Sequence, residues 1–269
     1  MKASLSKMKK QVQRGFTLVE IAIVLVIIGL LIGGVLRGQE LLNSARANSV
    51  AAQQSSIQTA YFGFVDRYKF MPGDLNGTQA LLINGMTVPA SGTAADSQVT
   101  LADSAAAFNN LAQAGFLSCT ACSSFVTAGT GGAAATYTAA VTSLSASNTM
   151  VNVFGSPLAF INDTTLVGAV AGGNFMGTAG ESSKPMVTTG GTLTSNMLAE
   201  LDRKSDDGNP AGGSIRYTDI QATSSVTTSA AGTAGTGAYA ATGNAAKCAA
   251  GTAWVTAPPS GACQGTNLF

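Results

Sequence analysis

The chain has 269 residues, which is long enough for one globular domain plus a long extension. Its formal net charge is +1, and it contains no histidine, so the commonest general base and metal ligand is missing. Five of its 14 basic residues, and none of its 13 acidic ones, lie in the first 15 residues. The rest of the chain therefore carries a net charge of −4, which argues against nucleic-acid binding.

Residues 14–20 read Arg-Gly-Phe-Thr-Leu-Val-Glu, and the uncharged apolar segment Ile21–Leu36 follows directly. Residues 16–36 are long enough to cross the hydrocarbon core of a bilayer as a helix. The basic residues before them favour a cytoplasmic N-terminus. Glu20 needs an explanation, because a carboxylate inside a bilayer costs a few kcal/mol.

Two simpler interpretations of this segment explain fewer of its features. A cleaved secretory signal peptide would use Ala45-Arg46-Ala47, which lies too far beyond Leu36, and the apolar run is longer than usual for such a signal. A plain signal anchor explains the apolar length but leaves Glu20 and the Gly15–Phe16 junction unexplained.

The basic leader, the Gly15–Phe16 junction and Glu20 together closely resemble the N-terminus of type IV prepilins, including the pseudopilins of type II secretion. The resemblance covers residues 9–69 with high specificity and the rest more loosely. It implies that a membrane aspartyl peptidase cuts after Gly15 and methylates the new N-terminal Phe16. It also implies that Glu20 pairs with the N-terminal amine of a neighbouring subunit. Such a pair offsets the desolvation of both charges and specifies the assembly register.

The apolar pattern continues beyond the membrane-length segment. Apolar residues recur at roughly helical spacing from Leu41 to Tyr68, and no proline occurs in residues 16–71. One helix of about 54 residues, about 80 Å long, is therefore predicted. Together with the resemblance this gives an α+β fold, in which a long helix packs under an antiparallel-sheet head. The predicted division is a cleaved leader (1–15), the long helix (16–70, with 16–36 in the membrane or filament core) and the head (71–269).

Local signals outline the head. Met71-Pro72-Gly73-Asp74 ends the long helix, and a short helix begins at a Ser104 cap and stops at Gly115. The expected surface loops are residues 84–100 and the Thr/Ser/Ala/Gly tract 222–246. Strands are expected at residues 150–154, 158–161 (after a Gly155-Ser156-Pro157 turn), 165–170, 214–220 and 252–256.

An acidic segment follows a predicted helix, with Asp202, Asp206, Asp207 and Asn209 close together. Short polar side chains of this kind stabilise turns by bonding nearby backbone, so a structural turn is expected. The alternative is a calcium site, since carboxylate and amide oxygens are the ligands that calcium prefers. Some pseudopilins use calcium in this part of the fold, although the spacing does not match an EF-hand. No other cofactor is expected.

The four cysteines, Cys119, Cys122, Cys248 and Cys263, allow three pairings. An exported head faces an oxidising compartment, which favours disulfides. The C-terminal pair encloses 14 residues and resembles the disulfide-bounded C-terminal region of many pilins. We expect Cys248–Cys263 and Cys119–Cys122. Neither a thioredoxin-like strand–helix context nor a second short-spaced pair for zinc is present.

The predicted function is structural: a subunit of a type IV pilus or related filament, with a minor pilin or a type II secretion pseudopilin as the alternative. An alternative of another class is a membrane-anchored binding ectodomain that never polymerises. No enzyme is predicted, since histidine, a G-x-S-x-G element and, after residue 15, a Ser-x-x-Lys element are missing. The expected partners are other pilin subunits, prepilin peptidase and the inner-membrane assembly platform. The expected location is the bacterial inner membrane before assembly, and an extracellular pilus or periplasmic pseudopilus afterwards.

Overall fold

The longest element is helix α1 (Leu18–Tyr68), 51 residues in the computed structural model. The structure describes residues 15, 17–82, 87–88, 97–99, 103–123, 126–127, 135–137, 144–162, 184–218 and 245–269. Contacts divide the chain into two units, residues 1–43 and 44–269, with the division inside α1. The predicted long helix is confirmed to within two residues at each end.

The end of α1 is marked by a change in backbone conformation. Lys69 adopts a φ of 62°, Pro72 cannot continue a helix, and Gly73 adopts a φ of 92°. A Cβ on Gly73 would lie only 2.9 Å from that of Ala107. A side chain is therefore excluded at this turn by both the backbone angle and the close approach of the following helix, α3 (Ser104–Gln113).

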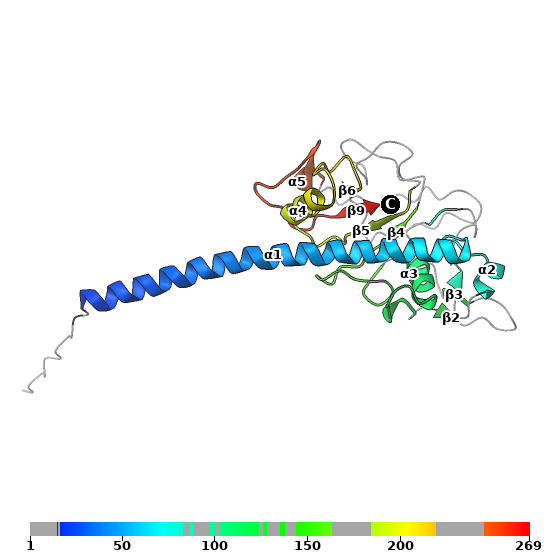
Figure 1. Cartoon of the computed structure of the whole chain (residues 1–269), viewed down its shortest axis with the longest axis horizontal. Coiled ribbons are helices and arrows are strands. Elements are labelled where there is room, and N and C mark those ends of the chain that lie inside the picture. The colour runs from blue at the N-terminus through cyan, green and yellow to red at the C-terminus, as the bar shows by residue number, and fades with distance from the viewer. Residues whose placement is uncertain are drawn as a thin grey trace, which may run out of the picture. The chain divides into compact units, whose positions relative to one another are not determined.

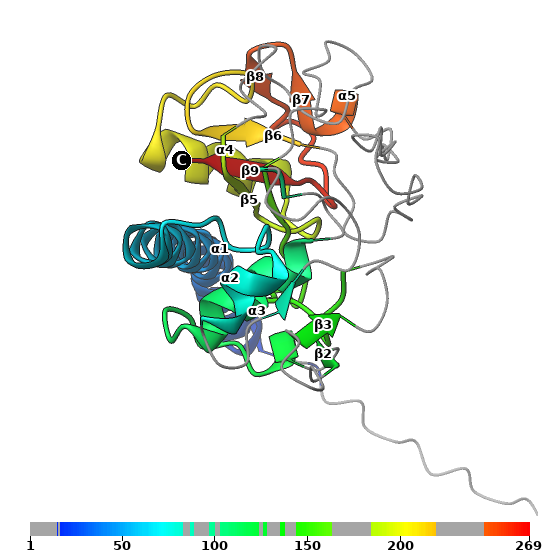
Figure 2. The same ribbon diagram turned by 90° about the vertical axis from the view of Figure 1, so that its right-hand side faces the viewer.

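Within the second unit, one face of α1 is buried. Its buried residues recur every three or four positions: Ala47, Val50, Gln54, Ile57, Ala60, Tyr61 and Phe64. Val50 packs in one cluster with Leu198, whereas Phe64 packs in another with Leu111. This part of α1 accordingly lies between α4 (Ser195–Ser205) with its sheet on one side and α3 on the other (Figures 1 and 2).

The main sheet is antiparallel, as predicted, and has the strand order β4-β5-β9-β6. Its strands are β4 (Phe160–Ile161), β5 (Met186–Thr188), β9 (Gly265–Leu268) and β6 (Ile215–Tyr217). Val187 pairs with Asn267, and Asn267 pairs in turn with Ile215. Gln54 of α1 donates its Nε2–H to the Thr188 carbonyl at 3.0 Å, so helix and sheet are joined by a polar contact as well as by apolar packing.

The remaining elements are short. They are the helices α2 (Gly77–Leu81), η1 (Ala121–Ser123) and α5 (Ala245–Cys248), and the hairpin of β7 (Ala249–Ala250) and β8 (Ala253–Trp254). A three-stranded sheet orders β1 (Thr87–Val88), β3 (Ala135–Tyr137) and β2 (Val126–Thr127), with β1 and β3 parallel.

Aromatic side chains join the C-terminus to α1. The ring of Phe269 lies 5.4 Å from that of Tyr61 and 6.2 Å from that of Phe160, measured between centroids. The Phe269 N–H donates to the Pro185 carbonyl. Aromatic pairs at these distances stabilise beyond the area that they bury, so the last residue is part of the packed structure.

Several predicted strands were wrong or displaced. Residues 150–154 form a turn with one isolated bridge, Val151 to Pro157, because Asn152 accepts hydrogen bonds from the backbone of the following residues instead of pairing. Within the described residues, the predicted strands 158–161, 214–220 and 252–256 correspond to the shorter strands β4, β6 and β8, respectively, and residues 219–220 lie outside the described residues. Strands β5 and β9 of the main sheet were missed, as were β1, β2, β3 and β7.

The predicted end of α3 is confirmed, whereas its predicted cap is wrong. Gly115 follows the end of α3 with a φ of 79°, as predicted for a glycine stop. The Ser104 cap was wrong: Asp103 is the N-cap, and the Ser104 hydroxyl accepts from the Phe160 N–H at 2.7 Å. Residues 165–170 and most of the predicted loops (84–86, 89–96, residue 100 and 222–244) lie outside the described residues. Within the first predicted loop, residues 87–88 form β1 and Val99 forms an isolated bridge with Asn162; residues 245 and 246, at the end of the second loop, belong to α5.

Candidate processing and assembly site

Glu20 is held by the N-terminal cap of its own helix. The Thr17 N–H and the Thr17 hydroxyl each donate to Glu20 Oε2 at 2.9 Å, and the Glu20 N–H donates to Thr17 Oγ1 at 3.3 Å. This is a capping box, with threonine before the helix and glutamate in its first turn. A carboxylate here also complements the positive end of the helix dipole. The sequence therefore places Glu20 in a defined orientation at the start of α1.

The segment after Glu20 presents apolar side chains to the outside all round the helix. From Leu18 to Asn43, no residue of α1 is buried, and Ile21–Leu36 carries no charge. Among the described residues, α1 is the one helix long and apolar enough to span a membrane, although an N-terminal signal sequence passes the same test. An apolar surface of this length is favourable only in lipid or against other apolar helices.

One carboxylate oxygen of Glu20 is not used by the cap. Gly15 is exposed, with open space where a Cβ would lie, and Phe16 is outside the described residues. Both capping bonds of Glu20 end on Oε2, so Oε1 can accept from a cationic donor while the cap stays intact. Cleavage at Gly15–Phe16, methylation of Phe16 and pairing through Glu20 stay predictions.

A polar network joins α4 to α1 where the second unit begins. Lys204 Nζ lies 2.6 Å from Glu200 Oε1 and 2.9 Å from Asn48 Oδ1, and the Ser44 hydroxyl donates to Glu200 Oε1 at 2.6 Å. Lys204, and then Ser44, lower the pKa of Glu200. The network connects the first residues of the second unit to α4, although its lysine and glutamate remain partly exposed.

The acidic segment forms a hydrogen-bonded turn after α4. Asp202 is fully buried; its Oδ2 accepts from Trp254 Nε1 at 2.7 Å and its Oδ1 from the Gly208 N–H at 3.3 Å. Burial, the largest effect, raises the pKa of Asp202, and the neighbouring Asp207 and Asp206 raise it further. Asp202 thus connects the turn to the β7–β8 hairpin.

The other members of the turn are engaged in the same way. Asp206 accepts from the Ser214 N–H, Asp207 from the Asn209 N–H, and Asn209 from the Ala211 N–H. The structure does bring oxygens of the three aspartates within 4.8 Å of one another, as a metal site would require. Because backbone N–H groups already bond these side chains, their geometry fits a structural turn better, and we do not propose a calcium site.

The structure contains both expected disulfides, Cys119–Cys122 and Cys248–Cys263, with Cα separations of 5.5 and 5.7 Å. Cys248 and Cys263 are buried in the cluster that contains Leu198 and Trp254. Their disulfide joins the end of α5 to the residues before β9. Cys119 and Cys122 flank the start of η1, beside α3, where Asn109 Nδ2 donates to the Cys122 carbonyl at 3.1 Å.

Three residues with a part in these sites were missed from the sequence. Thr17 had a recognisable signal, because Thr-x-x-Glu before an apolar run is the pattern of a capping box. Trp254 had none, since Asp202 lies 52 residues away in the chain; for Lys204 the four-residue spacing from Glu200 was a signal, but its contact with Asn48 spans 156 residues. Their roles depend on the tertiary fold.

Comparison with known proteins identifies the N-terminal segment. Residues 10–36 match the prokaryotic N-terminal methylation motif, the prepilin-type cleavage and methylation signal typical of type IV pilins and pseudopilins. Neither a curated protein nor a solved structure matches the chain. The motif contains Gly15, Phe16, Thr17 and Glu20, and the apolar segment to Leu36.

Proposed function

We propose that this chain is a structural subunit of a type IV pilus or a related filament, processed by prepilin peptidase and polymerised through α1. The observation that carries the proposal is the combination, inside the matched motif, of an exposed apolar helix with one oriented carboxylate at its first turn. Before assembly, residues 16–36 anchor the chain in the inner membrane. After assembly, the same surface packs against other subunits.

The energetic logic explains why one acid is retained in an apolar helix. The amine created at Phe16 by cleavage is cationic, and the carboxylate of Glu20 in the next subunit is its partner. Leaving either charge unpaired in an apolar environment costs several kcal/mol, whereas pairing them offsets that penalty. Only one stagger between neighbouring helices makes the pair, so Glu20 selects the register. Thr17 holds the carboxylate in place before the partner arrives.

Processing is tested by expressing the full chain in cells with and without prepilin peptidase and measuring its intact mass. We expect loss of residues 1–15 and gain of one methyl group when the peptidase is present. Gly15→Leu should leave the full-length chain in the membrane, whereas Gly29→Leu, a glycine in open space farther along α1, should be processed normally. A mature chain beginning at any other residue would contradict the proposal.

Assembly is tested with Glu20→Leu, which removes the charge but keeps an apolar helix. The variant should insert and be cleaved but fail to enter filaments, because a neighbour's amine is left unpaired. Glu40→Leu, the next acid along α1, is the matched control and should assemble. A processed wild-type chain that stays in the membrane as a monomer would instead favour a non-polymerising ectodomain. Identification of the subunits in sheared filaments distinguishes a pilin from a pseudopilin.

A further inference from the structure

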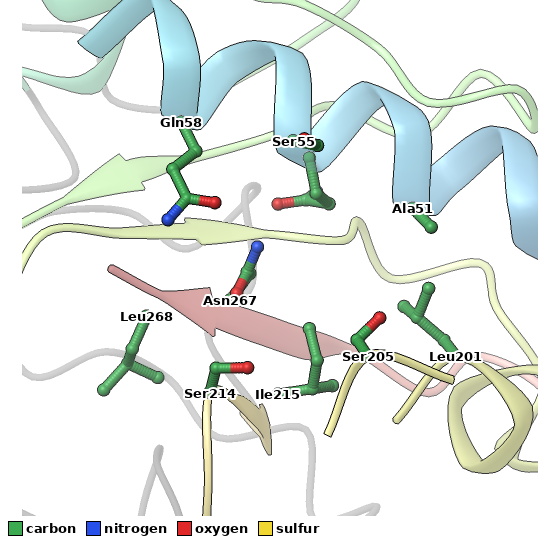
Figure 3. A pocket seen from close by; sticks show the side chains of 10 residues that line it. Ala51, Ser55, Gln58, Leu201, Ser205, Ser214, Ile215, Asn267 and Leu268 are labelled. Carbon is green, nitrogen blue, oxygen red and sulfur yellow. The ribbon is translucent and has the colours of Figure 1, made fainter. Parts of the chain in front are cut away.

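A pocket of about 220 Å³ lies within the second unit, between α1, the end of α4 and strands β6 and β9 (Figure 3). It is separate from the N-terminal motif, which ends at Leu36. Its walls come from α1, from the neighbouring elements α4 and β6, and from β9, three regions that are far apart in the sequence. The fold therefore creates this pocket, and no sequence motif predicts it.

Polar side chains converge on this pocket without using their hydrogen-bonding capacity on the protein. Within the described part of the chain, no hydrogen bond involves the side chains of Ser55, Gln58, Ser205, Ser214 or Asn267. Gln58 from α1 and Asn267 from β9 point toward each other across the pocket (Figure 3). Three hydroxyls and two amides supply both donors and acceptors, from both sides of the pocket.

Gln54 adds a buried acceptor to the same wall. Its side chain is only 2% exposed, and its Nε2–H bond to the Thr188 carbonyl determines which way the amide faces. Its Oε1 has no partner. Because this oxygen has almost no exposed surface, a ligand's donor would reach it only if the side chains of the wall moved, so the hydroxyls and amides of the other lining residues are the primary contacts.

The lining also limits the chemistry of that ligand. None of the ten lining residues is charged, so a charged ligand would lose hydration without gaining an ionic partner. Leu201, Ile215 and Leu268 supply apolar surface beside the polar groups. A pocket of about 220 Å³ is also smaller than the 300–1,000 Å³ typical for drug-sized ligands. The occupant should be small, uncharged and amphipathic.

We propose that this pocket binds one neutral pyranose ring of a carbohydrate. Each sugar hydroxyl both donates and accepts, and hydroxyls are distributed around the ring, which matches donors and acceptors placed on opposite walls. The C–H surface of the ring matches the apolar residues. A peptide unit fits less well, because it offers one N–H and one C=O and cannot pair with all these side chains.

The test uses the full chain purified in lauryldimethylamine oxide, since maltoside detergents would compete as sugars. The probes are methyl glycosides of glucose, galactose, mannose and N-acetylglucosamine, followed by saturation-transfer NMR and by the melting temperature. A ligand that binds only the native state raises the melting temperature with its concentration. At least one glycoside should bind saturably, whereas glucuronate and glucosamine, which carry charge, should not.

Two adjacent serines give a matched pair of variants. Both are exposed, but Ser55 lines the pocket and Ser56 lies outside the lining. Ser55→Ala should weaken glycoside binding by about 3- to 10-fold, the typical effect of one lost hydrogen bond, and Ser56→Ala should not change it. Gln58→Leu, at a half-buried helix position that tolerates leucine, should weaken binding at least as much and guards against a folding defect in any one variant.

Three outcomes would overturn the proposal. The first is that no glycoside binds at tens of millimolar. The second is that a glycoside binds equally to the wild type, Ser55→Ala and Gln58→Leu, which would place it elsewhere. The third is that N-acetylglycine N-methylamide, an uncharged peptide probe, binds in a Ser55-dependent way while the glycosides do not, which would assign the pocket to a peptide segment.

Discussion

The two halves of α1 form one continuous helix from side chains that meet opposite environments. Residues 18–43 are mostly apolar on every side, and none of them is buried. Residues 44–68 alternate apolar and polar positions, and the face that includes Val50, Ile57 and Phe64 is buried in the core of the second unit. Helix formation thus does not decide the role of a segment. The pattern of apolar side chains decides that role. A helix that is apolar on one face packs this face in the protein core, whereas a helix that is apolar all round packs against lipid or other helices.

Truncating one large apolar side chain in each half of α1 tests this difference most directly. Phe64 is fully buried against Leu75 and Leu111, so Phe64→Ala should lower the free energy of unfolding by about 3–5 kcal/mol. Leu25→Ala, in the exposed half, should leave unfolding of residues 44–269 unchanged within about 0.5 kcal/mol. Urea unfolding of the full chain in detergent micelles, followed by Trp254 fluorescence, measures both. Equal effects would show that the halves do not differ as described.

The two disulfides of the second unit close loops of different length and should therefore differ in how much they stabilise it. Removing the Cys248–Cys263 bond, as Cys248→Ala/Cys263→Ala, should destabilise by about 3 kcal/mol, as expected for a loop of this length. Removing the Cys119–Cys122 bond should cost less, about 2 kcal/mol, because its loop is much shorter. Both values come from unfolding curves of the double variants. A larger effect for the short loop would mean that packing, not loop closure, dominates.

Features with local sequence signals could be predicted, whereas features formed by residues far apart in the chain could not. The long helix and the N-terminal methylation motif were predictable because their signals are local: an unbroken apolar run, no proline, and an acid at a fixed distance from Gly15. The turn after α4 was also local, since Asp207 and Asn209 bond backbone two residues on. Each of these features is determined by residues within a few positions of one another.

The head was harder to predict because its partners are distant. Strand β9 contains Gly265 and Asn267, which have weak strand preference, yet it is central to the sheet because β5 and β6 flank it. Residues 150–154 look like a strand, but the Asn152 side chain forms a local turn. The pocket is likewise formed by Ser55, Ser205 and Asn267, which only the fold brings together.

Asp202 predicts how the stability of the second unit depends on pH. Burial raises its pKa in the folded state above the unfolded value near 3.8, so between the two values the folded chain binds more protons. Stability conferred by this group is therefore fully present below the unfolded pKa and is lost as pH rises through the folded pKa. Asp202→Asn should flatten this decline, measured by urea unfolding over a pH series. A decline that is just as steep in Asp202→Asn would assign it to another group.

The smallest effect is expected from the network at the junction between the two halves of α1. Lys204 bonds Glu200, Asn48 and Ser44, but its side chain is 44% exposed, so water and salt weaken the ion pair. Lys204→Met keeps the apolar stem and removes the charge, and should lower the free energy of unfolding by about 0.5 kcal/mol. Arg203→Met, the neighbouring exposed cation, is the control. Since this is a screened pair, the difference between the two variants should shrink in high salt. A difference of several kcal/mol that persists in high salt would instead make this network, rather than the apolar face around Phe64, the main attachment of α1.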